Sequence, residues 1–130
     1  MGIPVVDRRG NVVSMTTTVE ASMGSFHFTQ GFILNNQLTD FDASPTDALG
    51  NPIANKLEAG KRPRSSMAPT LVFRKGSGSA RGQFVMGTGS PGGATIIQFV
   101  AKTLVGALDW GLDAQQATSL VNFGAANSAT

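Results

Sequence analysis

Glycine residues cluster between a predicted strand and a predicted helix, in the segment Gly87-Thr-Gly-Ser-Pro-Gly-Gly93. Backbone N–H groups at the start of a helix have no partner within the helix and lie at its positive end. The amides of Gly92 and Gly93 could therefore hold an anion, or the oxyanion of an acyl-transfer intermediate. A tight structural turn explains the same glycines. Nucleotide binding is a third alternative, although the segment lacks the Lys-Ser/Thr ending of a P-loop and no strand follows to complete a βαβ unit.

Hydroxyl and carboxylate side chains share one face of a strand predicted over residues 12–19. Side chains alternate along a strand, so one face is largely apolar and consists of Val13, Met15, Thr17 and Val19. The other face is polar and consists of Ser14, Thr16, Thr18 and Glu20. These groups could contact a polar ligand or a reacting group, and exposure to solvent explains the pattern equally well.

A run of amides and a carboxylate follows the apolar segment 31–34, in the order Asn35-Asn-Gln-Leu-Thr-Asp40. Each of these groups needs a hydrogen-bond partner if it remains close to the core. The run therefore suggests polar recognition at the end of a strand. The alternative is structural, with Asn35 and Asn36 forming a turn and Asp40 capping a helix or loop.

The composition limits the chain to one domain or part of one, and it excludes several kinds of site. Its 130 residues are 41% hydrophobic and 14% charged, which suits a single core over residues 1–130. There is no Cys and one His, so disulfides, thiolate sites and a His-based metal site are excluded, and no cofactor or metal is expected. A net charge of +2 without a basic cluster does not favour nucleic acid.

The longest apolar stretch, Ile96 to Trp110, is too short and too polar to span a bilayer, so no membrane contact is expected. The first residues, Met1 to Pro4, show neither the basic nor the apolar region of a secretory signal.

The elements that must position these residues are hairpins followed by helices. β-branched residues on both sides of a Gly-Asn turn predict a hairpin from Val5 to Val19. A second hairpin is predicted over 70–86, with a flexible turn at 75–82, and a long surface loop lies between the hairpins at 42–64. This order predicts an α+β fold.

Two helices are predicted near the C-terminal end. The first starts near Pro91, and residues at intervals of four are expected to be buried, namely Ile96, Val100, Leu104 and Leu108. Apolar residues beside them predict burial of more than one face. The second helix is predicted to begin with Asp113 as its N-cap and to stop near Asn122 to Gly124.

Taken together, the motifs resemble the small chain of γ-glutamyltransferases, which are N-terminal-nucleophile hydrolases. The matching segments are Val5 to Glu20, Gly31-Phe-Ile-Leu-Asn-Asn-Gln-Leu-Thr-Asp-Phe41, Lys61-Arg-Pro-Arg-Ser-Ser-Met-Ala-Pro-Thr70, Gly87 to Gly93, and Asp109-Trp-Gly-Leu-Asp-Ala-Gln-Gln-Ala117 with Asn122-Phe-Gly. The resemblance implies a partial αββα sandwich with antiparallel strands and two C-terminal helices.

The resemblance also implies a set of functional residues. They are Thr18, which orients the nucleophile; Glu20, Gln37, Asp40, Ser65 and Ser66, which contact the γ-glutamyl substrate; and Gly92 and Gly93, whose amides form the oxyanion hole. Carboxylates suit the substrate's ammonium group, and amide or hydroxyl donors suit its carboxylate.

The chain departs from the family pattern at its beginning. Family members start this chain with a catalytic Thr, which aligns immediately before Met1. The family's small chain continues beyond Asn122-Phe-Gly, and its large chain supplies the other wall of the pocket. The resemblance thus implies the substrate-binding and oxyanion half of a γ-glutamyltransferase or glutathione hydrolase, inactive on its own because the nucleophile is missing. The alternative is an inactive, truncated paralogue that serves as a structural or amino-acid-binding domain.

The expected partners follow from the same resemblance. They are γ-glutamyl compounds such as glutathione, and the large chain of the same precursor. An isolated copy is expected to self-associate into a homo-oligomer through open strand edges and apolar surface. A periplasmic or secreted location is implied by the family.

Overall fold

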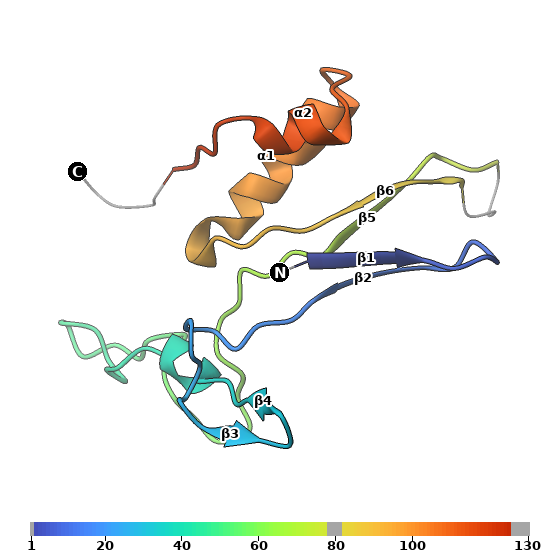
Figure 1. The fold of residues 1–130 in the computed structure, drawn as a ribbon. Helices are drawn as coiled ribbons and strands as arrows, with labels where there is room; N and C mark the ends of the chain where they lie inside the picture. Colours follow the sequence, from blue (N-terminus) through green and yellow to red (C-terminus); the bar gives the residue numbers. More distant parts are fainter. Residues whose placement is uncertain (1, 78–81, 126–130) are drawn as a thin grey trace. The chain divides into compact units, whose positions relative to one another are not determined.

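The computed structural model describes residues 2–77 and 82–125, with strands first and helices last (Figure 1). The elements are β1 (Gly2–Val6), β2 (Val12–Thr16), β3 (Phe28–Thr29), β4 (Phe32–Ile33), the 3-10 helix η1 (Gln37–Asp40), β5 (Thr70–Phe73), β6 (Phe84–Thr88), the 3-10 helix η2 (Gly93–Thr95), α1 (Ile96–Leu108) and α2 (Ala114–Ser119). All strand pairs are antiparallel. The predicted α+β order and both predicted hairpins are confirmed, although the strand predicted over 12–19 ends at Thr16. Part of the turn predicted at 75–82 lies outside the described residues.

Contacts group the chain into two compact units. Residues 1–17 and 66–130 form the strand–helix unit, and residues 18–65 form the loop unit. The single domain predicted over 1–130 stays a prediction.

In the strand–helix unit, β1 and β2 pair in a fixed register from Gly2 opposite Thr16 to Val6 opposite Val12. The outer face of this hairpin is apolar and exposed, and it consists of Ile3, Val5, Val13 and Met15. The inner face lies against β6, where the Ser14 hydroxyl donates to the Thr88 carbonyl oxygen (3.5 Å). Solvent exposure is therefore the wrong explanation for Ser14 and Thr16, which are both half-buried on this inner face.

Helix α1 buries one face only. Ile96 and Val100 are buried as predicted, whereas Leu108 is 50% exposed. The expected burial of more than one face is wrong. A second row of apolar side chains along α1, formed by Ile97, Ala101 and Val105, is exposed. When two faces of a helix are apolar, the sequence alone does not show which of them packs against the other described residues.

The second helix, α2, begins as the sequence predicts. The Asp113 carboxylate accepts the Gln116 N–H (2.8 Å), and the Gln116 side chain accepts the Asp113 N–H (3.0 Å), which completes a capping box. The helix ends at Ser119, a few residues earlier than expected. Its Ala117 is fully buried, and the Lys102 ammonium of α1 donates to the Leu120 carbonyl oxygen (3.1 Å) at its C-terminal end.

The loop unit contains little regular structure. Its β3–β4 hairpin pairs Phe28 with Ile33 and Thr29 with Phe32. From Asp42 to Arg64 there are only isolated bridges, which agrees with the predicted surface loop. Phe41 is the buried hydrophobic side chain among the residues described in this unit.

Two turns, one in each unit, share the sequence pattern Asp-x-x-Gly-Asn and the same hydrogen bonds. In the first, one Asp7 carboxylate oxygen accepts the Arg9 and Asn11 N–H groups (2.8 and 2.9 Å), and the other accepts the Asn11 side-chain amide (2.8 Å). Asn11 lowers the pKa of Asp7 below 3.8 through these bonds. The glycine of this turn, Gly10, has φ +79°, a left-handed conformation that favours glycine.

The second turn repeats this arrangement. Asp47 accepts the N–H groups of Leu49 and Asn51 (both 2.9 Å) and the Asn51 side-chain amide (3.1 Å). Asn51 lowers the pKa of Asp47 below 3.8.

These turns predict how stability depends on acid pH. A carboxyl group whose pKa is lower in the folded chain contributes stability that is present above the unfolded pKa and lost as the pH falls through the folded pKa. We expect the urea midpoint of unfolding to fall as the pH drops below about 4, and to fall less in the double variant Asp7→Asn/Asp47→Asn. The control is Asp42→Asn, whose side chain forms no hydrogen bond with the described residues. If the urea midpoint fell by the same amount at acid pH in the double variant as in the unsubstituted chain, the prediction would be contradicted.

Candidate functional site

The glycine-rich turn after β6 has an unusual backbone. Gly92 has φ +143° and Gly93 has φ +54°, and the Gly92 carbonyl oxygen accepts both the N–H (3.1 Å) and the hydroxyl (2.7 Å) of Thr95. Within the described part of the chain, the N–H groups of Gly92 and Gly93 donate no hydrogen bond, and both glycines are exposed. These two amides are available to an anionic group. The tight turn and the free amides thus coexist.

A glycine contact fixes the start of β1 beside this turn. A Cβ atom built on Gly2 would lie 2.8 Å from the Cα atom of Gly89, and one built on Gly89 would lie 3.0 Å from the Cα atom of Gly2. The next pair along is similar, since a Cβ atom on Gly87 would lie 2.8 Å from the Cβ atom of Pro4. Side chains at these glycines would force the hairpins apart, so glycine is required for the approach.

Thr16, which pairs with Gly2, carries a buried hydroxyl without a partner. Its Oγ1 atom forms no hydrogen bond with any described residue. A Cβ atom on Gly89 would lie 3.8 Å from this oxygen, so the hydroxyl faces the glycine contact. Thr16 is not among the functional residues that the family resemblance implies. Its position on the polar strand face is the signal that was available.

Thr18 and Glu20 lie beyond the end of β2, in the loop unit. The Thr18 hydroxyl oxygen accepts the Glu20 N–H (2.9 Å), and Glu20 adopts a left-handed backbone with φ +72°. A left-handed conformation is costly for a residue with a side chain, and such strain is common at functional sites. Both side chains are exposed.

In the run from Asn35 to Asp40, some polar side chains stabilise the local turn and others do not. Asn35 accepts the Gln37 N–H (3.0 Å) and Asn36 accepts the Ala21 N–H (3.0 Å), so the turn explanation holds for these two asparagines. Gln37 and Asp40 differ, because the Gln37 amide nitrogen donates to the Asp40 carboxylate at opposite ends of η1. This pair is half-buried and presents polar atoms that the turn does not use.

The two serines lie where the units meet in sequence. Ser65 is exposed and belongs to the loop unit, and Ser66 is half-buried and belongs to the strand–helix unit. Within the loop unit the structure brings together Thr18 with Glu20 and Gln37 with Asp40. Within the strand–helix unit it brings Gly92 and Gly93 together.

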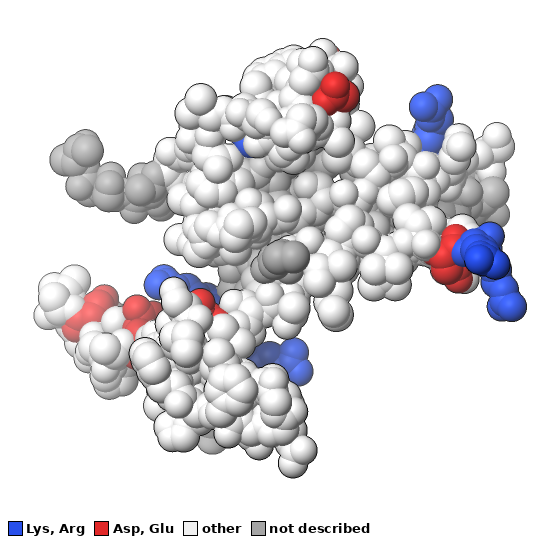
Figure 2. Space-filling view, viewed as in Figure 1, with Lys and Arg blue, Asp and Glu red and all other residues white. Residues whose placement is uncertain are grey.

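Other kinds of site find no support in the residues that the structure covers. No group of three or more His, Asp or Glu side chains there could hold a metal ion. None of the described helices has both the length and the hydropathy to cross a membrane. Figure 2 shows acidic and basic atoms at the tip of the β1–β2 hairpin and further charged groups on the loop unit.

Comparisons with known proteins agree on one family. The family model described as Gamma-glutamyltranspeptidase matches residues 3–128 of this chain. The chain is similar to the Glutathione hydrolase proenzyme of Bacillus subtilis (strain 168), at 44% identity over 115 residues that cover 87% of this chain and 18% of that protein. It is also similar to the Glutathione hydrolase proenzyme of Escherichia coli (strain K12), at 38% identity over 125 residues that cover 92% of this chain and 20% of that protein.

A solved structure agrees with these sequence matches. A mutant of Helicobacter pylori gamma-glutamyltranspeptidase superposes with a TM-score of 0.73 at 37% identity, which covers 89% of this chain and 62% of that chain. The chain thus spans about a fifth of the length of the curated relatives that it matches.

The two glycines of the turn should differ in their tolerance of alanine. A methyl group at Gly92 would lie 2.7 Å from the Phe99 ring, on a backbone with φ +143°, whereas no atom lies within 4 Å of one at Gly93. We expect Gly92→Ala to lower the free energy of unfolding by about 2–3 kcal/mol. Gly93→Ala should lower it by about 1 kcal/mol, the cost of a left-handed alanine. Urea unfolding followed by circular dichroism measures both, and equal losses would contradict the geometry.

Proposed function

The chain belongs to the γ-glutamyltranspeptidase family, and from this premise we propose that it is the substrate-binding and oxyanion half of a γ-glutamyltransferase or glutathione hydrolase. Its fold is that of the N-terminal-nucleophile hydrolases, as the sequence predicts. The proposed reaction transfers a γ-glutamyl group from a glutathione-like donor to an amine or to water.

The contact of Gly2 with Gly89 is the observation that carries the proposal. It fixes the first strand beside the turn whose Gly92 and Gly93 amides are free. The nucleophilic Thr of the family corresponds to the position immediately before Met1, two residues from Gly2. Free amides close to an attacking hydroxyl are what acyl transfer requires, because they stabilise the negative charge on the tetrahedral oxygen.

The proposed role of Thr18 rests on the family resemblance. Thr18 follows the end of β2 by two residues and begins the loop unit, where its hydroxyl oxygen accepts the Glu20 N–H. The Thr18 hydroxyl would orient the attacking hydroxyl, whose proton passes to the α-amine of the same residue and then to the leaving amine.

We propose that the residues implied by the family resemblance hold the charged end of the donor. Asp40 and Glu20 would contact the substrate's ammonium group, and Gln37, Ser65 and Ser66 would contact its carboxylate. The half-buried Gln37–Asp40 pair supports this assignment, since its carboxylate is already oriented by a neutral donor.

Exposed apolar surface supports the proposed partners. The outer face of the β1–β2 hairpin and one stripe of α1 carry exposed Val5, Val13, Met15, Ile97 and Leu108. Exposed apolar area of this kind marks an interaction surface. We propose that a large chain covers such surface in the complete enzyme, that an isolated copy forms homo-oligomers through it, and that the enzyme acts in the periplasm or outside the cell.

A chimera tests the proposal. In the Bacillus subtilis proenzyme, the matched residues are replaced by those of this chain, and the rest of that protein supplies the parts outside it. We expect Asp40→Ala to raise KM for a γ-glutamyl anilide by about one to two orders of magnitude, because the lost charge-assisted contact is worth roughly 1.5–3 kcal/mol. Thr18→Ala should lower kcat by about tenfold or more with little change in KM, because it disturbs the attacking group alone.

The controls use matched changes. Asp42→Ala removes a nearby carboxylate and should leave both constants unchanged. The 130-residue chain alone should release no amine from the anilide. An unchanged KM in the Asp40→Ala chimera would refute the glutamyl-binding assignment.

A further inference from the structure

We propose that Asn55 is a positioning residue, which holds the Asp40 segment and the Arg64–Ser65 segment in the geometry that binds the glutamyl group. This inference rests on the proposed function of those segments. Asn55 lies in the long loop and carries none of the substrate contacts itself.

The side chain of Asn55 joins two segments that are distant in sequence. Its Nδ2 atom donates to the carbonyl oxygen of Asp40 (2.7 Å), and its Oδ1 atom accepts the N–H of Arg64 (2.9 Å). Its main-chain carbonyl oxygen accepts the Asp42 N–H (3.1 Å). One residue therefore fixes the backbone on the C-terminal side of η1 and the backbone immediately before Ser65.

Only an amide side chain suits this place. A donor must face the Asp40 carbonyl while an acceptor faces the Arg64 N–H, and the two ends of an Asn amide supply both at once. An aspartate would turn a carboxylate oxygen toward the Asp40 carbonyl oxygen and lose the donor. A leucine would leave both main-chain groups without this partner.

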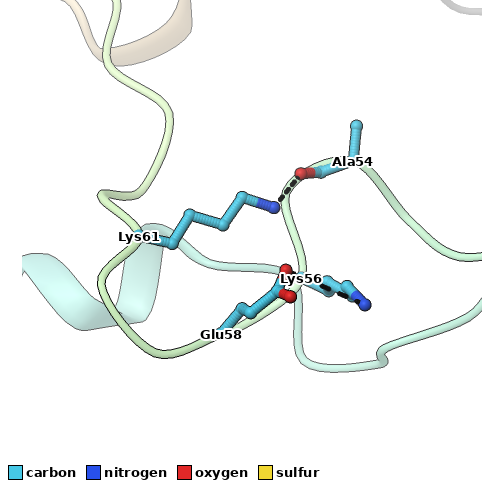
Figure 3. Close-up of polar contacts among 4 residues, drawn as sticks. All are labelled: Ala54, Lys56, Glu58 and Lys61. Carbon is cyan, nitrogen blue, oxygen red and sulfur yellow. Dashed lines mark hydrogen bonds and ion pairs between the residues drawn. The ribbon is translucent and has the colours of Figure 1, made fainter.

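The segment that carries Asn55 is itself held in place. The Lys61 ammonium group donates to the carbonyl oxygen of Ala54, the residue before Asn55 (Figure 3). The ion pair of Lys56 and Glu58 (3.8 Å) joins two partly exposed side chains in the same loop, and such exposed pairs contribute little.

Asp40 is consequently fixed at two points. Asn55 holds its main chain and Gln37 holds its carboxylate. Loss of the Asn55 side chain would remove the first restraint while every group that touches the substrate remains. The expected defect is thus in recognition of the substrate's ammonium group, with the chemical step intact.

The test compares Asn55→Ala with Asn51→Ala, a control in the same loop whose amide serves only the local Asp47 turn. In the chimera, kcat/KM is measured for a γ-glutamyl anilide and for the glutaryl anilide, which lacks the α-amine. We expect Asn55→Ala to reduce the preference for the γ-glutamyl donor about tenfold and Asn51→Ala to leave it unchanged. A general loss of stability would lower both rates alike and leave their ratio unaltered.

A second measurement uses the 130-residue chain itself. Hydrogen exchange at the Arg64 amide should quicken about tenfold or more in Asn55→Ala and stay unchanged in Asn51→Ala. A further variant, Asn55→Asp, keeps an acceptor for Arg64 and should retain slow exchange there while it loses the donor preference.

The outcomes separate this inference from the function on which it rests. No turnover by the unsubstituted chimera would overturn the proposed function, and the positioning role with it. Turnover by that chimera with an unchanged donor preference in Asn55→Ala would overturn the positioning role alone. Fast exchange at Arg64 in the unsubstituted chain would also overturn the positioning role.

Discussion

The close approach of two backbones, at Gly2 and Gly89, is the constraint on which the strand–helix unit depends. Packed sheets usually lie about 10 Å apart because side chains separate them. Gly2 and Gly89 have no Cβ atoms, so their main chains can lie in direct contact. This contact places the start of β1 beside the turn that leads into η2 and α1. The same contact leaves the Thr16 hydroxyl buried without a partner, at a cost of about 1–3 kcal/mol. Valine would fill this space without that cost, so stability alone does not account for threonine here.

The loop unit is organised by hydrogen bonds more than by a hydrophobic core. Phe41 is its buried hydrophobic side chain among the described residues, while Phe26 and Phe28 are exposed. Order comes instead from asparagine side chains that bond to main-chain groups: Asn36 to Ala21, and Asn55 to Asp40 and Arg64. Such bonds specify direction, which apolar contacts do not. This suits a segment that must present polar groups at fixed angles while it buries little surface.

Much of the fold could be predicted from the sequence because its signals are local. The Asp113 cap and the Gly10-Asn11 turn act through hydrogen bonds within four residues, and the sequence places both correctly. The exposure of Leu108 and the inner position of Ser14 could not be predicted, since each depends on what packs against the element. The β3–β4 hairpin also escaped prediction.

The candidate site was also predictable from the sequence only in part. Spacing alone left the turn at Gly92 open to three explanations, and the roles of Thr18, Gln37 and Asp40 came from the family resemblance. Asn55 gave no sequence signal, because its partners Asp40 and Arg64 lie 15 and 9 residues away. Contacts at such distances follow from the folded backbone and cannot be deduced from local pattern.

Under the proposed function, the bond between Gln37 and Asp40 is compatible with the substrate contacts of both side chains. An ionised carboxylate has about four acceptor positions, so the Asp40 oxygen that takes the Gln37 amide leaves the other oxygen for a substrate ammonium. The Gln37 nitrogen has two hydrogens, and one remains for a substrate carboxylate when the other is given to Asp40. Under the proposed function, the ammonium and carboxylate groups of the glutamyl substrate would therefore be bound by Asp40 and Gln37, which are hydrogen-bonded to each other. Their spacing would be set by η1, whose ends Gln37 and Asp40 form, and by Asn55, which holds the Asp40 main chain.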